Sequence, residues 1–207
     1  MITALVLAAG RSQRMGSPKL LLTLGGQTLL RRVIAAARVS RCDDVLVVLG
    51  ELARQVGQEA RAAGVRTVLN PRYREGMGTS IAAGIEALAP SCDAAVVLLG
   101  DQPCVDADAI NRLIDAYQAT GKPLVASRYG NVVGVPALIA RPLFAEAASL
   151  SGDIGARPLI VRHPELVAEV PLRSEASWDV DTPEDLARLK KVLEEAQSPR
   201  GVQPPPG

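Results

Sequence analysis

Four runs of apolar residues lie along the first half of the chain, at positions 2–7, 44–49, 66–69 and 94–99. Nearly continuous apolar runs are typical of parallel strands that are covered on both faces. The segments between them, at 29–38, 51–63 and 80–88, are predicted to be helices. This alternation, with its short connections, predicts an α/β fold: a Rossmann-like three-layer sandwich around a mostly parallel central sheet.

The second half of the chain predicts a departure from the parallel sheet. Two extended runs, 124–128 and 132–139, are joined by a Tyr-Gly-Asn turn, which is typical of a hairpin. Pro136 interrupts the second run, and proline favours an edge strand because it cannot donate a backbone hydrogen bond. We therefore expect the hairpin to be a small antiparallel excursion at the edge of the sheet.

Length and composition indicate one domain with an aliphatic core. The 207 residues fit a single α/β domain, which we place at residues 1–197. Residues 198–207 contain four prolines and two glycines, and this composition predicts a disordered tail. Hydrophobic residues make up 48% of the chain and aromatic residues only 2%, so the core must consist of Ala, Val, Leu and Ile.

Charge, apolar run length and cysteine content indicate which binding partners and which cellular location the sequence favours. A net charge of +1 gives no general attraction to nucleic acid or anionic membranes, and five aromatic residues are too few for a base-stacking platform. The apolar runs are too short to span a membrane. The three cysteines are odd in number and form no C-x-x-C pair, which favours a cytoplasmic location over a disulfide framework.

The first apolar run leads into a loop of small and cationic residues. These are Ala8, Ala9, Gly10, Arg11, Arg14 and Lys19. Small residues let the backbone approach a ligand, and cations with loop N–H groups suit a polyphosphate. Five residues separate Gly10 from Gly16, which fits neither a dinucleotide fingerprint nor a P-loop. An ordinary basic surface loop is the alternative interpretation.

Two later loops are candidates for ligand contacts. Residues 70–80 are rich in glycine and hydroxyl groups and open a helix, where free N–H groups attract anions, but from these residues alone ordinary capping by Thr79 or Ser80 is the better explanation. Asp101 follows the fourth apolar run, where open α/β sheets place ligand-handling groups, and Mg²⁺ prefers such a carboxylate together with phosphate oxygens. A plain turn stabilised by the Asp101 side chain is the alternative.

The first loop carries a family resemblance. Leu-Ala-Ala-Gly-Arg-Ser-x-Arg-Met-Gly at 7–16, followed by Pro-Lys at 18–19, resembles the signature of nucleotidyltransferases that activate small phosphorylated substrates, and within them the molybdenum cofactor cytidylyltransferase branch. The resemblance implies that Arg14 and Lys19 are catalytic. The nucleotide contacts that it implies in this loop are Leu7, Ala8, Ala9, Gly10, Arg11, Ser12, Arg14 and Lys19.

Later motifs extend the resemblance over roughly residues 1–195. Asn-Pro, Glu-Gly-Met and Ser in the 70–80 loop imply nucleotide contacts by Asn70, Gly76 and Ser80. Gly-Asp-x-Pro implies a catalytic, metal-binding Asp101, and the matching acid before the last helix implies Asp181 as second metal ligand. Asp179 is the substitute candidate for that second position.

A Gly-Asp-x-Gly-Ala-Arg motif at 152–157 completes the resemblance. It implies acceptor contacts by Gly155 and Arg157. Relatives usually have Lys where this chain has Ile154, so one positive charge of the acceptor loop is missing here.

The activity implied is transfer of CMP from CTP to the terminal phosphate of the molybdopterin cofactor, with Mg²⁺ as cofactor and pyrophosphate as leaving group. A molybdoenzyme or its chaperone is the implied protein partner. The pair Ala8-Ala9 stands where the guanylyl branch has Gly-Gly, which favours cytosine over guanine. Alternatives are guanylyl transfer, a different acceptor such as methylerythritol phosphate or a sugar phosphate, a nucleotide-binding regulator, and a dinucleotide oxidoreductase.

Overall fold

The computed structural model describes residues 1–10 and 18–197. Its strands are β1 (Ile2–Ala8), β2 (Thr23–Leu24), β3 (Gln27–Thr28), β4 (Asp44–Leu49), β5 (Arg66–Leu69), β6 (Ala94–Leu99), β7 (Leu124–Tyr129), β8 (Val132–Ala140) and β9 (Val167–Pro171). Its helices are α1 (Leu29–Val39), α2 (Ala53–Ala62), α3 (Met77–Glu86), α4 (Ala107–Thr120), α5 (Phe144–Ala147), α6 (Arg157–Arg162) and α7 (Pro183–Gln197). Within the described ranges, no helix has the length and apolar character needed to cross a membrane.

A seven-stranded sheet forms the centre of the molecule, in the order β5-β4-β1-β6-β8-β7-β9. β1 pairs in parallel with β4 and with β6, and parallel pairing also joins β4 to β5 and β7 to β9. β8 runs antiparallel to both of its neighbours, and β2 and β3 form a separate small antiparallel sheet. The predicted α/β fold with a mostly parallel sheet is therefore confirmed.

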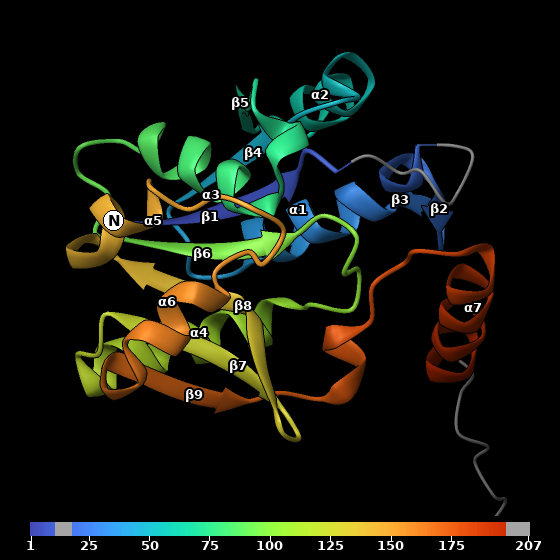
Figure 1. Ribbon diagram of the computed structural model, residues 1–207. Helices are drawn as coiled ribbons and strands as arrows, with labels where there is room; N and C mark the ends of the chain where they lie inside the picture. The colour runs from blue at the N-terminus through green and yellow to red at the C-terminus, as the bar shows by residue number, and fades with distance from the viewer. Residues whose placement is uncertain (11–17, 198–207) are drawn as a thin grey trace, which may run out of the picture.

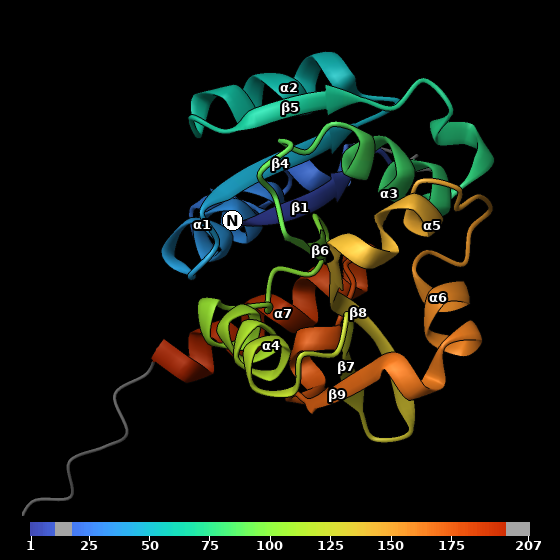
Figure 2. The ribbon, with the colours of Figure 1, turned by 90° about the vertical axis from the view of Figure 1, so that its left-hand side faces the viewer.

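Helices cover both faces of the sheet and complete the three layers (Figure 1). One core cluster joins Ala4 and Val6 of β1 to α1, α2 and α4, and the other joins Leu5 and Leu7 to α3, α5 and α6. Figure 2 shows α1 and α4 on one side of the sheet and α3, α5 and α6 on the other. Because successive β1 side chains enter opposite clusters, the strand is apolar at every position except Thr3.

The predicted edge position of the hairpin is wrong, since β8 lies inside the sheet between β6 and β7. A bulge accommodates the proline: Ala126 pairs with Ala137 but Ser127 pairs with Gly134, so Pro136 lies outside the regular ladder. Its missing N–H therefore costs no ladder hydrogen bond. Ser127 Oγ donates a hydrogen bond of 2.6 Å to the Pro136 carbonyl, which satisfies that buried acceptor.

The last helix packs beyond the three layers, against the β2–β3 hairpin. Leu189 of α7 forms a small apolar cluster with Leu24, Leu29 and Val180. In Figure 1, α7 lies at the end of the molecule toward which the arrows of β1 and β6 point. Burial of Val180 in this cluster thus brings the segment before α7 to the carboxyl ends of the central strands.

Helix α3 approaches β1 closely because residue 84 has no side chain. A Cβ atom at Gly84 would lie 2.4 Å from Leu5 Cδ1 and 2.9 Å from Leu5 Cγ, and Leu5 is completely buried. The glycine therefore sets the distance between this helix and the central strand.

We expect Gly84→Ala to destabilise the protein. Overpacking of this kind costs about 1–3 kcal/mol, which exceeds the gain of about 0.5–1 kcal/mol from removing a glycine from a helix. Urea unfolding of Gly84→Ala, of Leu5→Ala and of the double variant would measure the energetic coupling between the two positions. An unchanged unfolding midpoint for Gly84→Ala would refute the close packing.

Candidate active site

The site is built at the carboxyl ends of β1, β4 and β6, which parallel pairing brings to one edge of the sheet. The Gly100 N–H donates to the Leu7 carbonyl at 3.0 Å, so the Asp101 turn is attached directly to the end of β1. A Cβ at Gly50 would lie 2.4 Å from the Ala9 carbonyl oxygen, so the loops after β1 and β4 are also in close backbone contact. Ala8 and Ala9 are buried there, and Gly10 is exposed.

Three predicted charged residues converge at this edge. The Lys19 ammonium lies 2.5 Å from Asp101 Oδ2 and 2.7 Å from Asp181 Oδ1. The side chains of Lys19 and Asp101 are only 14% and 18% exposed, and that of Asp181 is 44% exposed. Burial alone lowers the pKa of Lys19, but the charges and hydrogen bonds of Asp101 and Asp181 outweigh it, so its pKa is raised. Lys19 is therefore positively charged at neutral pH.

Asp181 is held in place by the start of α7. The Asp185 carboxylate accepts hydrogen bonds from the backbone N–H groups of Asp181 and Thr182, and the Asp185 N–H donates back to Thr182 Oγ1 at 3.2 Å. This reciprocal arrangement is a capping box. The Val180 N–H also donates to the Asp101 carbonyl at 3.1 Å. Backbone hydrogen bonds thus join the two segments that carry the acids.

Asp179 occupies a different position from Asp181. Its Oδ1 accepts a hydrogen bond of 2.8 Å from Gln102 Nε2. Partial burial of the carboxyl group, followed by the negative charges of Asp101 and Asp181, raises the pKa of Asp179. Among the described residues, Lys19 contacts both Asp181 and Asp101, whereas Asp179 pairs with Gln102.

The carboxylates of Asp101 and Asp181 have the chemistry of a hard divalent cation site that is completed by phosphate oxygens and water. In the described part of the chain, no group of three or more His, Cys, Asp and Glu side chains is placed to hold a metal by itself. Such an incomplete ligand set suits a cation that is shared with a nucleotide. The metal roles of both acids remain predictions.

The predicted nucleotide loop is held together by buried polar side chains. Asn70 Nδ2 donates to Thr79 Oγ1 and Ser80 Oγ, at 3.0 Å each, and Asn70 Oδ1 accepts from the Arg72 N–H. Thr79 Oγ1 in turn donates to the carbonyl of Gly76 at 2.8 Å. Asn70 therefore orders the loop from inside, and a direct nucleotide contact by its amide stays a prediction.

The predicted acceptor loop is docked on this nucleotide loop. The Gly78 N–H donates to the Gly152 carbonyl at 2.8 Å, and the Gly152 N–H donates to the Glu75 carbonyl at 3.0 Å. Gly76 has φ 106°, and a Cβ there would lie 2.3 Å from the Gly152 carbonyl carbon. Helix α3 begins at Met77, before the predicted residue 80, and its N-cap residue is Gly76, which contacts the facing loop.

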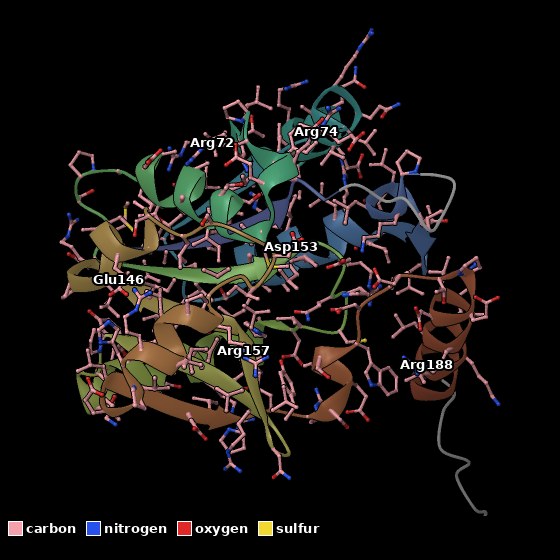
Figure 3. The ribbon with its side chains drawn as sticks, in the orientation of Figure 1. Arg72, Arg74, Glu146, Asp153, Arg157 and Arg188 are labelled. Carbon is pink, nitrogen blue, oxygen red and sulfur yellow. The ribbon has the colours of Figure 1, made fainter. Side chains whose placement is uncertain are left out.

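Gly155 and Arg157 belong to the same docked unit. A Cβ at Gly155 would lie 2.9 Å from the sulfur atom of Met77, and Arg157 is exposed at the first position of α6. Figure 3 shows Asp153 and Arg157 toward the carboxyl-end side of the sheet, with Glu146 toward the opposite side. The structure therefore joins the two predicted binding loops into one backbone-bonded unit.

Some predicted residues lie outside the described residues, and one contact was missed. Arg11, Ser12 and Arg14 fall in residues 11–17, so their predicted roles stay predictions. The sequence interpretation did not use Gln102, although it stands next to Asp101 in Gly-Asp-Gln-Pro. Gln102 Oε1 is buried and has no hydrogen-bond partner among the described residues, so only its amide nitrogen is satisfied, by Asp179.

The carboxyl edge of this mostly parallel sheet gathers a lysine, two carboxylates and two glycine-rich loops, which suits the binding of a nucleoside triphosphate and its cation. Residues 4–167 match the model of the MobA-like NTP transferase domain, and the chain belongs to this family. The predicted resemblance is confirmed at the level of this family, and membership of the cytidylyltransferase branch stays a prediction.

Similar proteins cover nearly the whole chain. Nicotine blue oxidoreductase of Paenarthrobacter nicotinovorans is 34% identical over 200 residues, which are 91% of this chain and 96% of that protein. The crystal structure of an Rv0371c homologue from Mycobacterium sp. strain JC1 has a TM-score of 0.82 at 33% identity and covers 95% of this chain and 98% of that one. Rv0371c of Mycobacterium tuberculosis H37Rv in complex with manganese has a TM-score of 0.77 at 32% identity, with 92% and 98% covered.

We expect Gly78→Ala to separate the two binding loops. A Cβ at residue 78 would lie 2.6 Å from the Ser151 backbone nitrogen, and this atom cannot rotate away as a side chain could. Hydrogen–deuterium exchange should show faster exchange in peptides covering residues 149–157. Gly134→Ala is the matched control, because a Cβ at Gly134 meets nothing within 4 Å. Equal exchange in both variants would contradict the docking.

We expect Asp179→Asn to stabilise the protein near neutral pH. Because the folded-state pKa of Asp179 is raised, the charged carboxylate lowers stability as the pH rises above the usual range of an aspartate. The side chain is partly exposed, so the gain should be no more than about 1 kcal/mol. Thermal unfolding should show the gain at pH 7 and none at a pH low enough to neutralise Asp179. A similar gain from Asp153→Asn would point to a general charge effect.

Proposed function

We propose that this protein is a divalent-metal-dependent cytidylyltransferase that transfers CMP from CTP to the terminal phosphate of the molybdopterin cofactor and releases pyrophosphate. Membership of the MobA-like NTP transferase family supports nucleotidyl transfer. The cytidylyl specificity, the acceptor and Mg²⁺ are the proposed parts. The product would pass to a molybdoenzyme or its chaperone, and the three free cysteines agree with the cytoplasmic location expected from the sequence.

The observation that carries the proposal is the convergence of Lys19, Asp101 and Asp181. The two carboxylates reach the same ammonium group from segments that are 80 positions apart. A triphosphate needs positive groups and its cation needs negative groups at the same place. This partly buried edge provides both kinds of charge. The manganese complex of a homologue supports a divalent cation as the natural counterpart of the acids.

The chemistry needs positioning and charge neutralisation more than proton transfer. An acceptor phosphate oxygen, already ionised near neutral pH, attacks the α-phosphorus of CTP, and the bond between the α-phosphorus and the bridging oxygen to the β-phosphate breaks. Lys19 stabilises the negative charge that moves onto the leaving pyrophosphate. A cation held by Asp101 and Asp181 would neutralise the phosphate oxygens and promote departure of pyrophosphate.

The docked loops supply the binding surfaces in this proposal. The loop with Gly76 and Ser80 would contact the nucleoside, and the loop with Gly155 and Arg157 would contact the acceptor. Their direct backbone hydrogen bonds would hold the two substrates in a fixed relative position.

A dinucleotide-dependent oxidoreductase is the second candidate, because the 34% identical relative is named an oxidoreductase. The five-residue spacing between Gly10 and Gly16 does not match the dinucleotide fingerprint. Retention of NADH or NADPH by the purified protein, followed by nucleotide fluorescence, would favour this candidate over nucleotidyl transfer.

The test is product formation. We expect incubation with each NTP, Mg²⁺ or Mn²⁺ and candidate acceptors to yield the cytosine dinucleotide of the molybdopterin cofactor, identified by mass, with pyrophosphate. Discrimination against GTP should be at least about 3 kcal/mol, since a site that hydrogen-bonds one base leaves buried polar groups unpaired with another. Equal use of GTP would refute the base specificity, and transfer to a different phosphate would refute the acceptor.

Asp101→Asn should abolish most of the transfer while the fold survives, because the amide keeps the size but not the charge that a divalent cation requires. Asp115→Asn on α4 is the matched control, since Asp115 is exposed and pairs with Arg41. A normal metal titration for Asp101→Asn would show that Asp101 is only a turn residue.

A further inference from the structure

One ammonium group takes the position between two carboxylates where the proposed function requires a divalent cation. Lys19 Nζ is 2.5 Å from Asp101 and 2.7 Å from Asp181, and these contacts lie in a partly buried setting. Two carboxylates at one position repel each other unless a cation lies between them. In the nucleotide-free protein, Lys19 supplies that positive charge.

The acids and the lysine differ in how firmly they are held. Asp101 lies in a turn closed by the Gln102 N–H to Leu99 carbonyl hydrogen bond of 3.2 Å, and Asp181 is fixed by the capping box of α7. The Lys19 backbone is fixed by its 3-10 turn, but the ammonium group lies at the end of a flexible four-carbon side chain. The carboxylates can therefore keep their positions while the ammonium moves.

We infer that the Lys19 ammonium group and a divalent cation exchange places during the reaction cycle. In the free protein the ammonium group lies between Asp101 and Asp181. When metal and nucleotide bind together, it moves to the triphosphate and the metal takes its place. This inference rests on the proposed function, because it requires a divalent cation at the two acids. The exchange further implies that the free protein binds metal weakly, because the nucleotide is needed to draw the Lys19 ammonium group away from the two carboxylates.

The exchange has a consequence that a purely structural lysine lacks. Removing the ammonium should lower turnover, since the triphosphate loses a cation, and at the same time raise the affinity of the nucleotide-free protein for metal. The nucleotide and the metal should also be positively linked in the wild-type protein, because each favours the state in which Lys19 has left the acids.

The experiment measures Mn²⁺ binding by electron paramagnetic resonance of the free ion, without and with a non-hydrolysable CTP analogue. Lys19→Met keeps the aliphatic stem, and Lys19→Gln is a second neutral variant in case the first is poorly folded. We expect both to bind Mn²⁺ at least about tenfold more tightly than the nucleotide-free wild type, as removal of a competing unit charge predicts. The analogue should tighten Mn²⁺ binding in the wild type and much less in the variants.

Two control proteins test whether the metal takes the position of the Lys19 ammonium group or only responds to the loss of a positive charge. Arg188→Met removes a nearby cation that lies over Trp178 and near Asp185, and it should leave Mn²⁺ affinity within about twofold of wild type, because this exposed charge is screened by water. Lys19→Met combined with Asp101→Asn should lose the gained affinity. Unchanged Mn²⁺ affinity in both Lys19 variants, or an equal gain in Arg188→Met, would overturn the exchange.

Failure of the exchange is distinct from failure of the proposed function. A wild-type protein that transfers CMP while its Lys19 variants gain no metal affinity refutes only the exchange. If the wild-type protein transfers no CMP but its Lys19 variants gain metal affinity, the proposed reaction is refuted and the exchange is supported. Lys19→Met that keeps its gained affinity after Asp101→Asn refutes the metal position itself and the exchange with it.

Discussion

Parallel pairing of β1 with β4 on one side and β6 on the other is the constraint on which the rest of the structure depends. It leaves β1 buried on both faces, and the strand is apolar except for Thr3, which is buried with its hydroxyl next to Cys92 Sγ. Polar chemistry is consequently displaced to the strand ends, where parallel pairing gathers three loops at one edge. The Gly100 to Leu7 hydrogen bond then fixes Asp101 beside the end of β1.

Close backbone contact sets the geometry of the binding loops as firmly as side-chain packing does. A Cβ at Gly50, Gly76 or Gly78 would lie under 3 Å from a facing backbone atom. Backbone atoms cannot adjust by rotamer, so these positions admit no side chain without moving a loop. The fold thereby fixes the positions of the two loops that are predicted to bind nucleotide and acceptor.

The alternation of apolar runs predicted most of the fold, and local motifs indicated Lys19, Asp101 and Asp181 as candidates. What failed depends on partners remote in sequence. Pro136 was assigned to an edge because its effect on a ladder is local, whereas the bulge that accommodates it needs β7. The family resemblance already preferred Asp181 to Asp179, but their different contacts, Asp181 with Lys19 and Asp179 with Gln102, depend on residues remote in sequence.

The position of His163 bears on the kind of chemistry this fold can perform. It is the single histidine of the chain, and its Nε2 lies 2.7 Å from Glu146 Oε2 at the end of α6. The hydrogen bond from His163, with burial opposing and Arg162 assisting, lowers the pKa of Glu146, so this carboxylate serves the α5–α6 contact. Figure 3 places Glu146 on the far side from Asp153. A reaction whose nucleophile is an ionised phosphate needs no histidine base, and a site of lysine and carboxylates suits that reaction.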